Sequence, residues 1–258
     1  MITTEQLKSL RDETGVSVMQ CKKALEEAGG DMEKARIILK KKSGDAAAKK
    51  ADRELGAGLV VTAQNGGKTV MLTLLCETDF VAKNTDFMSL AKTLADKALS
   101  EGKEAMETAS AALIGEAVQK LAENIKVGEV YMTDSANASV YNHNGQFAAV
   151  VVLKEKNDEL ARDIAMHTTA MRPTYLTEAD ISNDAKTAAK EIFAKEVEEQ
   201  SAGKPEEMKA KILEGKINSY FKEQILENQT FIKDPSKTVA QLVKEANNSI
   251  ESFKLAQI

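Results

Sequence analysis

Asp79 and Phe80 are the residues whose types and position most suggest a functional role. They follow an alternating, almost wholly apolar segment at residues 70–76, and a helical pattern resumes near Phe87. The apolar segment predicts a strand covered on both faces, so the pair lies in a turn between a strand and a helix. Two interpretations are open. The ring folds back into the core while Asp79 caps backbone N–H groups, or ring and carboxylate are held out for a partner.

The other reactive side chains do not predict an active site. The chain has 2 His and 2 Cys, and these give no nucleophile triad, metal-ligand set or disulfide framework. No glycine-rich loop followed by Lys and Ser or Thr is present, so no phosphate-binding site is predicted. We therefore expect no enzyme, no cofactor and no bound metal.

Composition restricts the class of protein further. The 258 residues are 43% hydrophobic and 29% charged, which is typical of a globular chain with one large or several small domains. The net charge of −5 gives no electrostatic case for nucleic acid or an anionic membrane. No apolar run approaches the length of a membrane span, and no secretion signal is visible, so we expect a cytoplasmic protein.

Residues 1–42 predict a compact module of three short helices. Thr4, Ser17 and Asp31 can cap them, and Gly15 and Gly30 lie at their breaks. The apolar positions of the helices are Leu7, Leu10, Val18, Cys21, Leu25, Ala35, Ile38 and Leu39. Residues 43–55 mix alanines and lysines without a continuous apolar face, so we expect a solvated linker rather than a nucleic-acid patch.

Residues 56–135 predict a first α+β subdomain. Strands at 58–63 and 69–76 flank Asn65-Gly66-Gly67, and Asn-Gly supplies the positive φ angles that a tight hairpin turn needs. A helix follows from about Phe87 to Ala98. A second helix at 107–125 and a third strand at 127–133 complete the subdomain.

The same order recurs in a second subdomain, predicted at 136–178 and 226–258. Strands at 138–141 and 146–154 flank a turn at His143-Asn144-Gly145, and a helix with Leu160 and Ile164 inward follows. A helix at 238–247 and a strand at 250–257 would complete it. The predicted fold class is therefore α+β, with a duplicated core of small antiparallel sheets covered by helices.

Residues 179–225 predict an antiparallel helical hairpin inserted into the second subdomain. Two helices with apolar stripes are separated by a short break at 201–205, where Gly ends one helix and Pro starts the next. The stripes are Ala185, Ala188, Ala189, Ile192, Ala194 and Val197, and then Met208, Ile212, Ile217, Tyr220 and Phe221.

The segment Cys76-Glu77-Thr78-Asp79-Phe80-Val81-Ala82-Lys83-Asn84 resembles the signature of bacterial translation elongation factor Ts. This family is the guanine-nucleotide exchange factor of elongation factor Tu. Parts of the first module, from Leu10-Arg11 to Cys21-Lys22-Lys23-Ala24-Leu25, resemble a second signature. The resemblance implies that this module is similar to a ubiquitin-associated three-helix bundle.

The resemblance also implies partner-binding residues. Phe80 would enter between helices of the G domain of elongation factor Tu, and Asp79 would disturb the polar network around Mg²⁺. Thr78, Asp79, Phe80 and Val81 are the positions implied to displace Mg²⁺ in that partner. The further partner contacts implied by position are Lys22, Leu121, Ala122 and His167.

Some positions depart from the family pattern. Ala122 stands where a glycine is typical, Arg172 where asparagine is usual, Gln20 where aspartate is frequent, and Leu75 where a polar residue is usual.

In some members the coiled-coil hairpin takes part in dimer contacts, so a homodimer through it is one expectation. Many members continue beyond the last strand, so we expect one partner contact to be missing. The alternatives to an exchange factor are an enzyme, or an interaction module without exchange activity.

Overall fold

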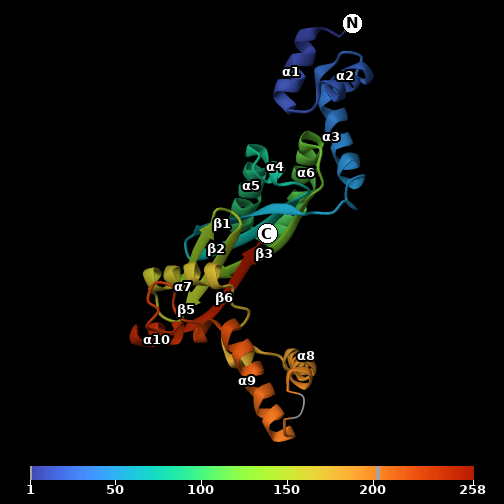
Figure 1. The fold of residues 1–258 in the computed structure, drawn as a ribbon. Coiled ribbons are helices and arrows are strands. Elements are labelled where there is room, and N and C mark those ends of the chain that lie inside the picture. Colours follow the sequence, from blue (N-terminus) through green and yellow to red (C-terminus); the bar gives the residue numbers. More distant parts are fainter. Residues whose placement is uncertain (1, 202–203) are drawn as a thin grey trace. The chain divides into compact units, whose positions relative to one another are not determined.

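The structure, a computed structural model, describes residues 2–201 and 204–258 (Figure 1). The chain forms two compact units. Unit 1 comprises Met1–Asp134, Asn142–Ala148 and Ala256–Ile258, and unit 2 comprises Ser135–Tyr141 and Ala149–Leu255. Part of the predicted hairpin break, at residues 202–203, lies outside the described residues. Each unit has its own hydrophobic core.

Unit 1 begins with three helices that share a small core, as predicted. Thr3, not Thr4, caps the first helix, because its hydroxyl accepts the Gln6 N–H and the Gln6 side chain accepts the Thr3 N–H. Ser17 and Asp31 cap the next two helices, which confirms both predictions. The helices are α1 (Thr4–Thr14), α2 (Val18–Glu27) and α3 (Met32–Ala48).

Helix α3 continues through the first part of the predicted linker. It ends at Ala48, and Ser43 within it is buried. A Cβ added at Gly115 of α6 (Lys103–Leu121) would lie 3.3 Å from Ser43 Oγ, so the two helices approach closely there. The extension is therefore supported by long-range packing, which a local apolar pattern does not reveal.

The first sheet of unit 1 has three antiparallel strands in the order β1-β2-β3. The turn after β1 uses Gly66 and Gly67 at φ 57° and 88°, which confirms the predicted hairpin. Residues 70–74 of the central strand are all buried, so the strand is covered on both faces as expected. The strands are β1 (Ala57–Asn65), β2 (Lys68–Cys76) and β3 (Ile125–Asp134).

Helices α5 (Thr85–Glu101) and α6 pack on this sheet and on each other. Their apolar faces join the strands in one core cluster. Its most buried large side chains include Phe87, Leu94, Met106, Leu72 and Leu74. Helix α6 begins and ends four residues earlier than the predicted range of 107–125.

A second three-stranded sheet has the order β4-β5-β6, so the strand near the C-terminus joins it as predicted. In unit 2, α7 packs Leu160, Ile164 and Ala165 into a core with Val151 and Leu226. The elements are β4 (Ala138–His143), β5 (Phe147–Leu153), α7 (Asp158–Met171), α10 (Val239–Glu245) and β6 (Ile250–Gln257).

Helices α8 (Asn183–Gln200) and α9 (Glu206–Gln224) form a pair in unit 2, drawn in orange in Figure 1. Ion pairs from Lys209 to Glu198 and from Lys216 to Glu196 show that the helices run antiparallel. Short 3-10 helices, Glu178–Asp180 and Leu226–Asn228, lie on either side of the pair. Four residues of the predicted apolar stripes are exposed: Ala188, and Ile192 by 66%, Met208 by 50% and Tyr220 by 44%. Among the described helices, none has the length and apolarity needed to cross a bilayer.

Candidate functional site

The segment around Phe80 folds as one short helical turn, α4 (Asp79–Ala82), between β2 and α5. Thr78 caps this turn, and its Oγ1 accepts a hydrogen bond from the Val81 N–H at 3.4 Å. Asn84 then caps α5 by accepting from the Asp86 N–H at 2.8 Å. The predicted capping role of Asp79 is therefore carried by Thr78 instead.

The Phe80 side chain is 82% exposed. Its neighbours hold the turn in place, because Ala82 is buried and Val81 packs against the core of unit 1. The interpretation in which the Phe80 ring belongs to the core is therefore wrong. A large apolar ring that is exposed on a fixed turn is a typical anchor for a protein partner.

Asp79 lies next to this ring and pairs with Lys83 one turn later. Lys83 Nζ donates to Asp79 Oδ2 at 2.8 Å. This hydrogen bond lowers the pKa of the Asp79 carboxyl, so the group is a carboxylate at neutral pH. The turn thus presents an apolar ring and a negative charge on adjacent residues.

The loop after α6 meets the Phe80 turn. The Glu123 carboxylate accepts hydrogen bonds from the Glu77 N–H, the Thr78 N–H and the Thr78 hydroxyl, at 3.1, 3.0 and 2.6 Å. Leu121 and Ala122 immediately precede Glu123, so the structure brings these two predicted site residues to the Phe80 turn. Sequence reasoning assigned no role to Glu123, because no local pattern indicates a contact between residues 45 positions apart.

Lys22 lies exposed on α2, where its nearest charge is Glu26 at 3.9 Å. Its helix belongs to the three-helix module. Besides the approach of Ser43 to Gly115, this module lies close to α6 at a second place. A Cβ added at Gly15 would lie 2.4 Å from Lys120 Cε, and Lys120 Nζ pairs with Asp86 at 2.8 Å. The turn that leads into α2 therefore lies against the end of α6 that carries Leu121.

His167 does not lie on the surface, which corrects the expectation of a direct partner contact. Its ring is 0% exposed in unit 2. Nε2 lies 3.0 Å from Gln229 Oε1, Nδ1 accepts the Ile232 N–H at 3.3 Å, and the Phe231 ring is 5.7 Å away. Burial lowers the pKa of His167, so the ring is neutral at pH 7. It serves as a packed structural residue.

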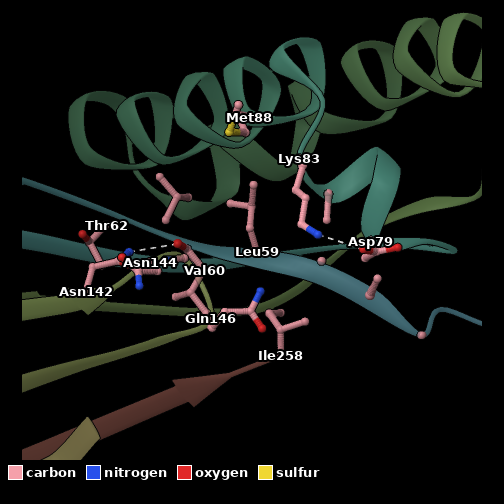
Figure 2. A pocket seen from close by; sticks show the side chains of 16 residues that line it. Leu59, Val60, Thr62, Asp79, Lys83, Met88, Asn142, Asn144, Gln146 and Ile258 are labelled. Carbon is pink, nitrogen blue, oxygen red and sulfur yellow. Dashed lines mark hydrogen bonds and ion pairs between the residues drawn. The ribbon is translucent and has the colours of Figure 1, made fainter.

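A hollow of about 830 Å³ lies beside α4 within unit 1 (Figure 2). Strand β1 lines one side of the hollow, and Asp79, Lys83 and Met88 also line it. Asn142 Nδ2 donates to the Val60 carbonyl at 2.9 Å in the same hollow. Within residues 2–201 and 204–258, no group of three or more His, Cys, Asp or Glu could hold a metal ion. The site has the features of a binding surface.

An exposed ring on a fixed turn is typical of proteins that bind other proteins, and comparisons with known proteins give the family of this chain. The model of the family Elongation factor TS matches residues 77–258. Similar proteins named Elongation factor Ts include that of Kineococcus radiotolerans, 37% identical over 97% of this chain and 96% of the relative. Those of Acholeplasma laidlawii and Xylella fastidiosa are each 36% identical, over 98% and 100% of this chain and 90% and 92% of the relatives.

The chain belongs to the elongation factor Ts family. Members of this family act in translation elongation as non-catalytic nucleotide exchange factors for elongation factor Tu.

Proposed function

We propose that this chain binds elongation factor Tu in its GDP form and promotes release of GDP, so that GTP can rebind. Family membership supports the partner, and the 82% exposure of Phe80 on a capped, anchored turn is the observation that supports the mechanism. The chain itself supplies binding energy only, and no bond is made or broken.

Exchange of this kind follows from thermodynamic coupling. A factor that binds nucleotide-free elongation factor Tu more tightly than the GDP form must weaken GDP binding by the same factor. Nucleotide is held in such proteins largely through phosphate contacts and Mg²⁺. A protein wedge that displaces the elements around these groups therefore speeds GDP release.

Each surface residue has a distinct part in this proposal. Phe80 enters between helices of the partner's G domain, and the Asp79 carboxylate perturbs the polar network around Mg²⁺. Leu121 and Ala122 extend the contact on the adjoining loop, and Lys22 adds a cation from the three-helix module. His167 has no direct contact in this proposal, because its buried ring acts only through the packing of unit 2.

Stopped-flow release of fluorescent GDP from elongation factor Tu tests the proposal. The wild-type chain should accelerate GDP release. The acceleration by Phe80→Ala should be at least about tenfold smaller, as expected for loss of an anchor residue. Ile37→Ala is the matched control, since it removes another exposed apolar side chain, 67% exposed in α3. Equal rates for wild type and Phe80→Ala, with both chains folded, would overturn the wedge mechanism.

We further propose that the hairpin of α8 and α9 mediates a homodimer. The support is that three large apolar side chains on this hairpin, Ile192, Met208 and Tyr220, are exposed. Sedimentation velocity over a range of concentrations should detect a dimer that Ile192→Glu shifts to monomer. A chain that stays monomeric at all concentrations contradicts this proposal.

A further inference from the structure

We propose that Glu123 is a positioning residue for Phe80, and that Glu77 and Asn124 complete a bracket that fixes the direction of the exposed ring. The inference rests on the proposed exchange function only for its effect on GDP release. The bracket comprises the hydrogen bonds between residues 77–78, before α4, and residues 123–124, after α6.

The first half of the bracket runs from Glu123 to α4. Glu123 Oε2 accepts the N–H groups of Glu77 and Thr78, while Oε1 accepts the Thr78 hydroxyl at 2.6 Å. Because a hydroxyl has only one proton, this bond leaves the Thr78 oxygen free to accept the Val81 N–H. Glu123 thus orients the cap that starts α4.

The second half runs in the opposite direction. Glu77 Oε1 accepts the Asn124 N–H at 2.6 Å, and Arg53 Nη1 donates to the same carboxylate at 3.2 Å. Each loop therefore supplies a carboxylate that accepts hydrogen bonds from the backbone of the other loop. The Asn124 hydrogen bond also lowers the pKa of Glu77, so this carboxylate is charged at neutral pH.

The bracket is needed because α4 cannot hold Phe80 by itself. The turn has four residues, and an isolated helix of that length is unstable in water. Phe80 is 82% exposed, so core packing of its own ring does not set its direction. The backbone of α4 has to set it, and that backbone is anchored by the Thr78 cap at its start and by Val81 and Ala82 in the core.

The same bracket also holds the segment that follows α3. The buried Asn124 side chain donates to the carbonyls of Ala51 and Arg53, at 3.3 and 2.9 Å. These residues connect the three-helix module, which carries Lys22, to β1. The Phe80 turn and the segment from that module therefore share one set of hydrogen bonds.

A reporter at position 80 tests the positioning without any partner. The chain has no Trp, so Phe80→Trp introduces a single indole. Time-resolved fluorescence anisotropy then measures the local motion of that indole. Adding Glu123→Ala should at least double the amplitude of the fast decay, while Glu116→Gln on exposed α6 surface should leave it unchanged. An unchanged amplitude in the Glu123→Ala background would overturn the proposal, whatever the exchange activity.

Exchange kinetics provide the second measurement, with the native Phe80 in place. Glu123→Ala and Thr78→Val should each reduce the maximal rate of GDP release at least about fivefold, with a half-saturating concentration within about twofold of wild type. Thr78→Ser keeps the hydroxyl and should retain the wild-type rate. If Thr78→Ser is as slow as Thr78→Val, loss of the Thr78 hydroxyl does not explain the slower GDP release, and the proposal fails.

These measurements separate the inference from the proposed function. If Phe80→Ala slows release but the folded Glu123→Ala and Thr78→Val chains do not, exchange through Phe80 stands and the positioning role is overturned. If wild type does not accelerate release at all, the exchange function fails, and the anisotropy result alone decides whether Glu123 orients position 80. Circular dichroism of each variant identifies any chain that is unfolded, and Glu123→Gln then replaces Glu123→Ala.

Discussion

The Ala122 N–H donates to the Val118 carbonyl at 3.0 Å, and this bond closes the last turn of α6 with Ala122 at φ 63°. That left-handed conformation crowds the Cβ of any residue except glycine. Ala122→Gly should therefore raise the free energy of unfolding by about 0.5–1 kcal/mol. Chemical denaturation followed by circular dichroism measures the change.

The matched control for this prediction is Ala112→Gly, which makes the same substitution at an exposed position inside α6. There the substitution should lower the free energy of unfolding by about 1 kcal/mol, because glycine relieves no strain at that position and raises the entropy of the unfolded chain. Opposite signs for the two variants are expected. A loss of stability in both would contradict the strain assigned to Ala122.

His167 should make the stability of unit 2 depend on pH. Burial lowers its pKa in the folded chain, so the unfolded chain binds a proton first as pH falls below about 6.5. This contribution to stability is therefore complete above that pH and is lost as pH falls through the folded-state pKa. Urea midpoints measured from about pH 7.5 to 5.5 should decline in wild type.

The control for the pH effect is the other histidine, His143, which is exposed. His143→Gln should retain the decline, whereas His167→Gln should flatten it. A decline that survives in His167→Gln would assign the effect to other groups.

Gly58 allows close approach of β1 to β2. A Cβ added there would lie 2.3 Å from the Leu74 carbonyl oxygen and 3.1 Å from the Leu75 Cα, both backbone atoms that cannot move aside cheaply. Gly58→Ala should therefore destabilise unit 1 by about 1–3 kcal/mol, as other overpacked sites do. Gly44→Ala is the control, because a Cβ at this position in α3 meets nothing within 4 Å and should add stability. Equal stability of Gly58→Ala and wild type would contradict the close contact.

Cys76 should react slowly with alkylating reagents while the chain is folded. Its buried thiol donates to the Thr78 carbonyl at 3.2 Å, and burial raises the pKa of the Cys76 thiol to about 11. Since the thiolate is the nucleophile, alkylation near pH 8 should be about 100-fold slower than in the urea-unfolded chain. Mass spectrometry of a Cys21→Ser variant isolates the reaction at Cys76. Similar rates in both states would show that the Phe80 turn opens readily.

The sequence predicted most elements of the fold, because their signals are local. Alternating apolar residues and the Asn65-Gly66 pair are sufficient to predict β1, β2 and their turn. Helical apolar spacing likewise indicated α5 and α7. The error at the start of α1 has a local cause too. Thr3 and Thr4 are both capping residues, and only the reciprocal bond with Gln6 selects Thr3.

The site was less predictable than the fold. Pattern alone left Phe80 either buried or exposed, since a ring at a strand-to-helix turn fits both. The role of Glu123 depends on a contact with Thr78 that only the folded chain creates. Arg172, like Ala122, has a positive φ, of 49°, at a helix end. Two of the four departures from the family pattern, Ala122 and Arg172, thus fall on left-handed backbone positions, which sequence comparison alone does not show.

The turn after β4 has a consequence for how the chain behaves at high concentration. Strand β1 lies at the edge of its sheet, and such an edge is a template on which another chain can add a strand. The Val60 N–H donates to the Gly145 carbonyl at 2.7 Å, and the Val60 carbonyl accepts from Asn142. The middle of the edge is therefore already occupied from within the same chain. Another chain cannot pair with these two backbone groups, so we expect the turn to reduce strand addition at this edge of β1.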